Sequence, residues 1–186
     1  MEDLLVWIDL EMSGLDPERH VILEIGTVIT NSLLQTVAEG PVFAIHHPVE
    51  ALHTMEAWSR EHHTASGLLD RVQSSIHDCQ GAKEQTLEFV SRHCGKGRSP
   101  LCGNSVWQDR RFLIRYMPEL EAFFHYRNID VSSIKELVKR WYPHLPPFQK
   151  KKAHTVMSDI EESIRELIYY RDHVFPPIED RDLQRT

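Results

Sequence analysis

Three β-rich runs crowd into the first 45 residues, and they restrict the possible folds more than any other feature of the chain. Residues 4–11 form an apolar run that ends at a turn-rich stretch, residues 13–17. A second run covers residues 21–30, and a third lies around residues 41–45. Strands this close together along the chain predict a sheet that begins with antiparallel pairing.

Helical patterns and short strand candidates alternate through the rest of the chain. The spacing predicts strands at residues 101–103 and 128–131, and helices over residues 64–75, 82–93 and 111–117 and from Pro118. This order is typical of a three-layer α/β domain with a mixed sheet. No repeat and no domain boundary is visible, so residues 1–175 are expected to form a single domain, with a polar tail at 176–186.

Two further helices are predicted from their caps and apolar faces. Ser133 and Glu136 have capping-box spacing, and the helix they open carries on one face Ile134, Leu137, Val138 and Trp141. A short, proline-rich connection, residues 143–153, follows that helix. The last helix places on one stripe Met157, Ile160, Ile164, Leu167 and Ile168.

Charge and cysteine content narrow the function classes. The net charge is −7 at pH 7, whereas proteins that bind long duplexes usually present a basic face. The charge therefore favours a small or single-stranded substrate over long duplex nucleic acid.

The sequence also predicts where the protein works. The three cysteines have no C-x-x-C spacing, and the chain shows no signal-peptide pattern. No apolar run approaches the ~20 residues of a membrane span. These features predict a cytoplasmic protein without a membrane partner.

The first pair of residues that points to chemistry is Asp9 and Glu11. At positions i and i+2 of a strand, their side chains lie on the same face. Two neighbouring carboxylates in an apolar run repel each other unless a cation neutralises them, and Mg²⁺ prefers such oxygen ligands. The alternative is that Glu11 lies just past the strand and Asp9 is a solvated edge residue, because D-x-E spacing is common.

Asp109 is the second candidate. It follows the short strand at residues 101–103, where a helix begins, and ligand sites of α/β proteins gather at such strand ends. An Asp near a helix start can also serve only the helix dipole, and an ion pair with Arg110 or Arg111 is equally compatible.

His154 and Asp159 form the third candidate. Five residues at ~100° each place them on different faces of one helix. We therefore expect His154 in the loop before the last helix and Asp159 about one turn inside it. Taken singly, each residue also fits a plain solvated position.

Together these residues describe one site. Asp9, Glu11, Asp109 and Asp159 would supply four carboxylates around one sheet edge. Two divalent ions ~3.5–4 Å apart in such a cage could clamp a phosphodiester. His154, whose unperturbed pKa lies near neutrality, would take the proton of the attacking water.

The chain resembles the oligoribonuclease family, a group of DEDDh 3′→5′ exonucleases. The resemblance runs from Val6 to about Phe175, and its longest strings are W-I-D-L-E-M-S-G-L-D-P-E from Trp7, H-T-A-S-G-L from His63, G-N-S with Q-D-R-R-F around residues 103–112, Y-M-P-E-L from Tyr116, and H-Y-R with D-V-S at residues 125–132. It implies a ribonuclease-H-like three-layer domain with a mixed five-stranded sheet flanked by helices.

The resemblance also implies roles. The four carboxylates would bind two Mg²⁺ or Mn²⁺ ions, His154 would be the base, and Tyr126 would belong to the active site, reaching the partner protomer's pocket or packing in the dimer interface. The substrate would be single-stranded RNA of a few nucleotides, cleaved by a cytoplasmic homodimer.

Short substrates have a physical rationale in this sequence. A wedge of Leu15 and Trp58 could sandwich bases by stacking. The far phosphate could be capped by His63, Ser105, Arg127 and Ser132, with the Arg127 guanidinium as its best ligand. Ordinary packing and capping is the alternative for Trp58, His63 and the serines.

The last motif departs from the family pattern at one position. Relatives usually carry His-x-Ala-x-Asp-Asp there, and this chain has Ser158 before Asp159.

Two other functions remain compatible with the sequence. A DEDDh exonuclease could trim the 3′ ends of longer RNA or DNA, although the acidic net charge and the His63 and Arg127 strings oppose this. A catalytically silent nucleotide-binding relative would have lost a metal carboxylate, and all four carboxylates are present.

Overall fold

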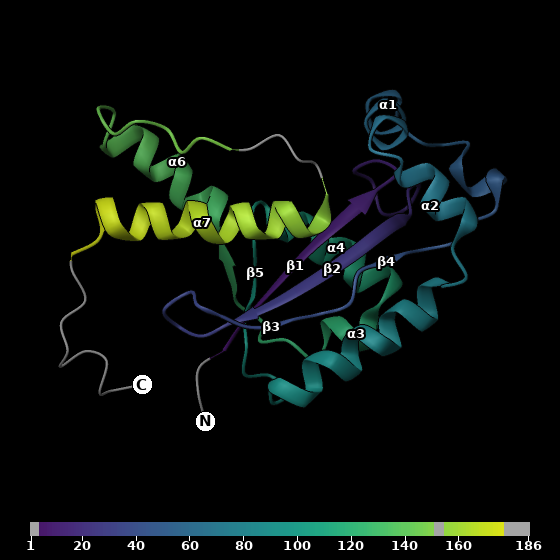
Figure 1. The fold of residues 1–186 in the computed structure, drawn as a ribbon, viewed down its shortest axis with the longest axis horizontal. Coiled ribbons are helices and arrows are strands. Elements are labelled where there is room, and N and C mark those ends of the chain that lie inside the picture. The colour runs from purple at the N-terminus through teal and green to yellow at the C-terminus, as the bar shows by residue number, and fades with distance from the viewer. Residues whose placement is uncertain (1–3, 151–154, 177–186) are drawn as a thin grey trace.

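A computed structural model describes residues 4–150 and 155–176 of the chain (Figure 1). Its sheet is mixed and has the strand order β3-β2-β1-β5-β6, with β4 paired to β2 beside this path. The strands are β1 (Leu5–Met12), β2 (Ile22–Thr30), β3 (Thr36–Glu39), β4 (Phe43–Ala44), β5 (Leu101–Gly103) and β6 (Asn128–Asp130). The predicted mixed sheet is therefore confirmed. The strand expected around residues 41–45 is the two-residue β4, and β3 is an addition to the five expected strands.

β2 runs antiparallel to every strand that it pairs with, whereas β1, β5 and β6 run parallel to one another. β1 pairs antiparallel with β2 along its whole length, with Asp9 opposite Gly26 and Glu11 opposite Glu24. On its other side β1 pairs in parallel with β5, but only at Val6 and Trp7. The second half of β1 therefore runs past the end of β5, and its edge is open to side chains from elsewhere.

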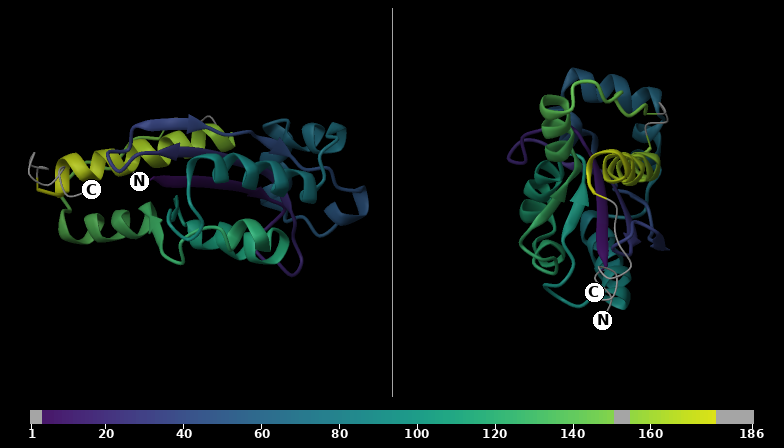
Figure 2. Two further views of the ribbon diagram at one scale, coloured as in Figure 1. Left: turned by 90° about the horizontal axis from the view of Figure 1, so that it is seen from below. Right: turned by 90° about the vertical axis from the view of Figure 1, so that its left-hand side faces the viewer.

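Helices cover both faces of the sheet (Figures 1 and 2). Their bounds are α1 (Ala57–Ala65), α2 (Leu68–Ser74), α3 (Cys79–His93), α4 (Val106–Tyr116), α5 (Pro118–Glu121), α6 (Val131–Trp141) and α7 (Val156–Val174), and a 3₁₀ turn η1 spans Val49–Leu52. Within residues 4–150 and 155–176, no helix combines the length and the apolar character that a bilayer crossing requires.

The alternation of β1 separates two hydrophobic cores. Val6, Ile8 and Leu10 point into one core, which α3, α4 and α5 cover. Trp7 points into the other, which α6 and α7 cover. Since side chains alternate along a strand, Asp9 and Glu11 share the face of Trp7 and so lie on the α7 side.

Several predicted boundaries are wrong, each for a local reason. The helix expected over residues 64–75 is two helices, because Gly67 adopts φ 70° between α1 and α2. The expected helix start at Ser133 is two residues too late: α6 begins at Val131, and Asp130 caps it by accepting from the Ser132 amide. Strand β3 was not predicted, because its side chains are mostly exposed and show no apolar alternation.

The ends of α4 and α6 also differ from expectation. Helix α4 begins at Val106, five residues before the predicted start. On α6, Val138 is buried, but Leu137 is 42% exposed and Trp141 67% exposed. The apolar face predicted for α6 therefore continues beyond the core into solvent. The stripe predicted for α7 is confirmed: Ile160 and Ile164 are buried, and Met157, Leu167 and Ile168 pack against the same core.

Candidate active site

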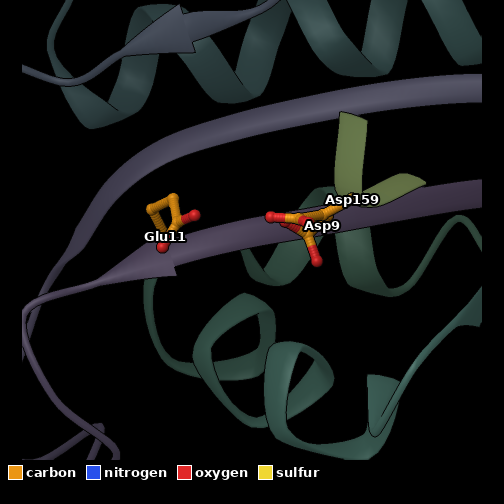
Figure 3. A group of neighbouring side chains, drawn as sticks. All are labelled: Asp9, Glu11 and Asp159. Atoms are coloured by element: carbon orange, nitrogen blue, oxygen red, sulfur yellow. The ribbon is translucent and has the colours of Figure 1, made fainter. Parts of the chain in front are cut away.

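Three carboxylates meet where the second half of β1 passes under the first turn of α7. Asp9 and Glu11 come from β1, and Asp159 lies one turn inside α7, as predicted (Figure 3). One oxygen from each of the three lies within 4.8 Å of the others. Residues from opposite ends of the chain are thus brought into one cluster, which we call the carboxylate cluster.

The close approach of α7 to the sheet depends on Gly26. This residue lies opposite Asp9 on β2. A Cβ atom at Gly26 would come within 2.2 Å of the Val156 side chain, in the first turn of α7. The missing side chain lets the start of α7 rest on the backbone of β2, which brings Asp159 within reach of Asp9.

Asp109 approaches the same strand from the other layer. It is 6% exposed in the first turn of α4. Its Oδ1 accepts a hydrogen bond of 3.0 Å from the Leu10 amide, on the stretch of β1 beyond its pairing with β5. Asp109 is therefore beside the carboxylate cluster, with one oxygen committed to the backbone.

Burial and mutual repulsion shift the pKa values of these acids upward. Burial first, and then the charge of Asp109, raise the pKa of Asp9 well above its usual range. Burial and the charges of Asp159 and Glu24 raise the pKa of Glu11 to about 7. Burial also raises the pKa of Asp109 to about 8, although the hydrogen bond from Leu10 opposes the change. The described residues around these acids therefore leave much negative charge unbalanced.

This donor set fits a hard divalent cation. Converging carboxylate oxygens at a partly open position are the ligands that Mg²⁺ and Mn²⁺ take in proteins. A cation would also remove the repulsion that raises the pKa values of Asp9 and Glu11. The cluster therefore has both the ligand type and the electrostatic reason to bind metal.

A further acid, Glu24, lies on β2 next to Glu11, and the sequence did not predict its place beside the site. It is 4% exposed and lies directly opposite Glu11 across the strands. Like charges in that position destabilise a sheet, and Arg71 relieves this by donating to Glu24 through Nη2 at 2.9 Å and Nε at 3.3 Å. The wide sequence separation of Glu24 and Arg71 hid the pair.

A pocket opens over the carboxylate cluster. Its walls come from β1, α1, the turn after α1 and the first turn of α7. The lining residues are Asp9, Leu10, Glu11, Trp58, His62, His63, Ser66 and Asp159. His63 is buried, with Nε2 2.9 Å from the Met12 carbonyl oxygen and Nδ1 3.8 Å from Glu11 Oε2. His63 therefore contacts the end of β1 and Glu11 as well as the pocket.

Leu15 and Trp58 project into solvent near this pocket, 61% and 65% exposed. The Trp58 ring stacks on His62 at 3.9 Å between ring centroids. The Leu15 backbone is held from both sides, because its amide donates to Glu56 Oε1 at 3.4 Å and its carbonyl accepts from Gln108. The two predicted wedge residues are exposed side chains on fixed backbone.

Ser105 and Ser132 meet at the starts of α4 and α6. Their hydroxyl oxygens are 3.1 Å apart, and both backbone amides donate to Asp130 Oδ1. Ser132 also donates to Asn104 Oδ1 at 3.1 Å. The two predicted cap serines thus form one hydrogen-bonded pair beside two helix N-termini, which favour anions.

Behind these serines lies a buried network around Glu166 of α7. Glu166 is fully buried, and its carboxylate accepts hydrogen bonds from Asn104 at 3.1 Å and Tyr170 at 2.8 Å. It also forms ion pairs with Lys135 at 3.0 Å and Lys150 at 3.5 Å. Burial raises the pKa of Glu166, but hydrogen bonds from Lys135 and Tyr170 outweigh this effect, and the pKa is lowered. We call this set the Glu166 network. It was missed because an acid in a helix rich in acids resembles a solvated residue.

Tyr126 and Arg127 lie away from the carboxylate cluster of their own chain. They precede β6, whose first residue, Asn128, pairs with Leu101 at the start of β5. Arg127 lines a pocket that also contains Leu4. Tyr126 is 73% exposed, and the Arg127 guanidinium carbon is 5.3 Å from its ring centroid. Both residues are thus at the opposite strand ends from Asp9.

Two expectations concern the start of α7. His154 lies outside the described residues, so its predicted role as base stays a prediction. Ser158 forms a capping box with Thr155: the Thr155 side chain accepts from the Ser158 amide, and the Ser158 hydroxyl accepts from the Thr155 amide at 3.1 Å. Ser158, which departs from the usual motif, therefore stabilises the start of α7 through its side chain.

Comparison with solved structures identifies the fold. Exonuclease I from Methylocaldum szegediense superposes with a TM-score of 0.66 at 14% identity, covering 92% of this chain and 41% of that chain. Another exonuclease I structure gives a TM-score of 0.68 at 12% identity, covering 99% and 46%. The chain therefore has the ribonuclease-H-like fold predicted for it and spans less than half the length of these exonucleases.

Sequence comparisons identify the family. The family model of the RNase T type, described as exonuclease, matches residues 6–167. An oligoribonuclease of Marinobacter nauticus is 55% identical over 174 residues, covering 93% of this chain and 97% of that protein. An oligoribonuclease of Shewanella amazonensis is 58% identical over 172 residues, covering 92% and 95%. The chain therefore belongs to the oligoribonuclease family of exonucleases.

Proposed function

We propose that the chain is a 3′→5′ exoribonuclease that hydrolyses short oligoribonucleotides, down to dinucleotides, to mononucleotides. The observation that carries this proposal is the convergence of Asp9, Glu11 and Asp159, with Asp109 beside them. Family membership supports the same activity, since the similar proteins over nearly the whole chain are oligoribonucleases.

The four carboxylates would hold two divalent ions, Mg²⁺ or Mn²⁺. Bound there, such ions supply positive charge to both the attacking and the leaving oxygen of the phosphodiester. Asp109, fixed by its bond from Leu10, keeps one oxygen for this task. His154 acts as general base and takes the proton of the attacking water.

The preference for short substrates would come from residues that bind the two ends of the RNA. Leu15 and Trp58 wedge between bases near the carboxylate cluster, and stacking on Trp58 contributes roughly 1–3 kcal/mol per base. Ser105 and Ser132 hold the phosphate at the far end, together with Arg127 supplied by the partner protomer. His63 binds the substrate at the near end, because it lines the pocket beside Glu11. The paired hydroxyls of Ser105 and Ser132 support this, because they lie 3.1 Å apart at the starts of two helices, whose dipoles favour a phosphate.

The active form is proposed to be a cytoplasmic homodimer in which Tyr126 and Arg127 serve the partner protomer's site. Their position far from their own cluster and the 73% exposure of Tyr126 support this arrangement. Exposed apolar side chains on neighbouring elements, Trp141, Trp107 and Ile114, fit a surface that a second copy covers. Three free cysteines agree with a reducing compartment.

A cleavage assay on 5′-labelled RNA of two to about twenty nucleotides tests the proposal. We expect fastest turnover of the shortest substrates in Mg²⁺ or Mn²⁺, none in chelator, and none for Asp159→Asn. Equal rates on dinucleotides and twenty-mers, or on RNA and DNA of that length, would favour the alternative of an exonuclease trimming longer 3′ ends. Activity that survives chelation would contradict the metal mechanism.

A further inference from the structure

One guanidinium organises the segment that presents Tyr126. Arg110 lies on α4 directly after Asp109, and its side chain is 13% exposed. It donates from Nη2 to the His125 carbonyl at 3.1 Å, and from Nη1 to the Tyr126 carbonyl at 3.1 Å and to Asn128 Oδ1 at 2.6 Å. Two consecutive peptide carbonyls and one side chain are thus held by a single residue.

A fourth bond fixes the guanidinium itself. Arg110 Nε donates to Glu121 Oε1 at 2.8 Å, and Glu121 is the last residue of α5. Four of the five N–H groups of an arginine are therefore used. Because the guanidinium is planar, these four bonds define both its position and its orientation.

The segment needs such a support. His125 to Arg127 lie outside regular structure, between α5 and β6. Phe124 anchors the segment in the core, and the His125 amide donates to the Ser99 carbonyl at 2.9 Å. Past that point the Tyr126 side chain projects into solvent, and its peptide carbonyl is held by Arg110. Groups that act at a site must be fixed to within about 0.5 Å, which loops achieve only with outside support.

Two consecutive residues of helix α4 therefore serve different sites. Asp109 is buried beside the carboxylate cluster of its own chain. Arg110, about 100° further around the helix, holds the segment that a partner would use. We propose that Arg110 is the positioning residue that holds Tyr126 in the geometry in which the partner subunit's site uses it, an inference that rests on the homodimer proposed above.

Arg110→Lys is the variant that isolates this role. Lysine keeps the positive charge beside Glu121, but its single ammonium cannot span the three acceptors of residues 125–128. Arg115→Lys is the matched control: Arg115 is on the same helix, is 55% exposed and lies 3.6 Å from Glu18. We expect Arg110→Lys to lower kcat/KM on a dinucleotide about 10–100-fold, the usual cost of losing a supporting group. Arg115→Lys should retain the wild-type value.

Mixed dimers separate positioning in trans from damage to the variant's own site. Arg110→Lys chains carry intact carboxylates, and Asp159→Asn chains carry an intact Arg110. In a tag-purified heterodimer of the two, one complete site remains. We expect activity of about half the wild-type value, since one of two symmetric sites is restored. A heterodimer that stays as inactive as its parents would overturn the proposal, because the defect would then lie within one chain.

A control pair separates failure of this inference from failure of the homodimer. Tyr126→Ala mixed with Asp159→Asn should recover to the same level if Tyr126 acts in trans. Recovery of this pair but not of the Arg110→Lys pair defeats the role of Arg110 alone. Recovery of neither pair defeats the use of Tyr126 in trans, and the role of Arg110 with it.

A milder variant covers the case in which Arg110→Lys does not fold. Asn128→Ala removes one acceptor of Arg110 and leaves both peptide carbonyls. We expect the same recovery in a mixed dimer from a smaller initial loss. An Asn128→Ala homodimer with wild-type kcat/KM, measured on protein with unchanged thermal stability, would count against the fixed segment.

Discussion

Helix α7 contributes one acid to each of two groups about two turns apart, the half-buried Asp159 and the buried Glu166, and the two groups are built in opposite ways. At its first turn, Asp159 meets Asp9 and Glu11, and the pKa values of Asp9 and Glu11 are raised. Further along, Glu166 forms ion pairs with two lysines and accepts hydrogen bonds from a tyrosine and an asparagine, and its pKa is lowered. One helix thus contributes to a cluster of acids with raised pKa values and to a network that lowers the pKa of its acid.

The contrast shows how the surroundings of a carboxylate can indicate whether it is structural or functional. Burying a charge without partners is expensive, whereas a fully hydrogen-bonded carboxylate is tolerated. The Glu166 network is complete within the protein and stabilises it. In the carboxylate cluster, the neighbouring acids raise the pKa values of Asp9 and Glu11, so we expect cations to stabilise it and their removal to lower the stability of the protein. The pKa of Glu166 is lowered, whereas the pKa values of the proposed catalytic acids Asp9 and Glu11 are raised.

Asp159→Asn should produce the largest effect and should act in opposite directions on activity and stability. We expect kcat/KM to fall by about 100-fold or more, because the proposed metal site loses one of its ligands. The melting temperature of the metal-free protein should rise, because one repelling charge leaves the cluster. Cleavage of a dinucleotide and calorimetry in chelator measure the two effects. A lower melting temperature in chelator would show that the cluster is not repulsive.

Metal should stabilise the protein, and more at pH 8 than at pH 6. The pKa values of Glu11, about 7, and Asp109, about 8, exceed their unfolded values. The folded state therefore binds more protons than the unfolded chain, and metal-free stability falls as pH rises from about 4.5 to 8. A cation at 100 times its Kd adds about 2.7 kcal/mol, or roughly 5–10 °C, once protons no longer compete. Melting scans at both pH values would contradict this if the metal response were equal.

Glu166→Gln should lower stability by about 1–3 kcal/mol with or without metal, because a buried network loses its charge and an acceptor. The control is Glu161→Gln on the same helix, where the exposed pair with Arg165 at 2.9 Å should contribute less than about 0.5 kcal/mol. Urea denaturation in chelator compares the two variants. Equal losses would remove the contrast between the Glu166 network and an ordinary surface pair.

Ser158→Ala should have the smallest effect. It removes half of the capping box at the start of α7, which costs about 1 kcal/mol or less. Because the Thr155 side chain still caps the helix, Asp159 should stay in place and kcat should be unchanged. Denaturation and dinucleotide cleavage on the same preparation measure both. A loss of kcat without a loss of stability would mean that Ser158 acts on the site itself.

Much of this site could be predicted from the sequence. The D-x-E spacing on an apolar strand predicts two carboxylates on one face, and the structure confirms this for Asp9 and Glu11. The position of Asp159 one turn into the last helix is also confirmed. These predictions succeed because local geometry alone fixes which side of a strand or helix a residue occupies.

The parts that could not be predicted depend on tertiary contacts. The link between Glu24 and Arg71 joins a strand to a helix far along the chain, and no local pattern marks it. Arg110 was expected to make at most a surface ion pair, but it contacts three residues of the segment 125–128. The cap at Asp130 replaced the one expected at Ser133 because its side chain reaches the Ser132 amide. Two competing caps differ too little in energy for sequence patterns to decide.

The distance along the chain between β1 and α7 has a consequence for synthesis. A ribosome adds roughly 5–20 residues per second and releases the N-terminal strands first. During that time the nascent polypeptide contains Asp9 and Glu11, but the helix that brings Asp159 to them is missing. Translation must therefore reach the last helix before the carboxylate cluster can form, so an unfinished chain cannot cleave RNA while it is still attached to its own messenger.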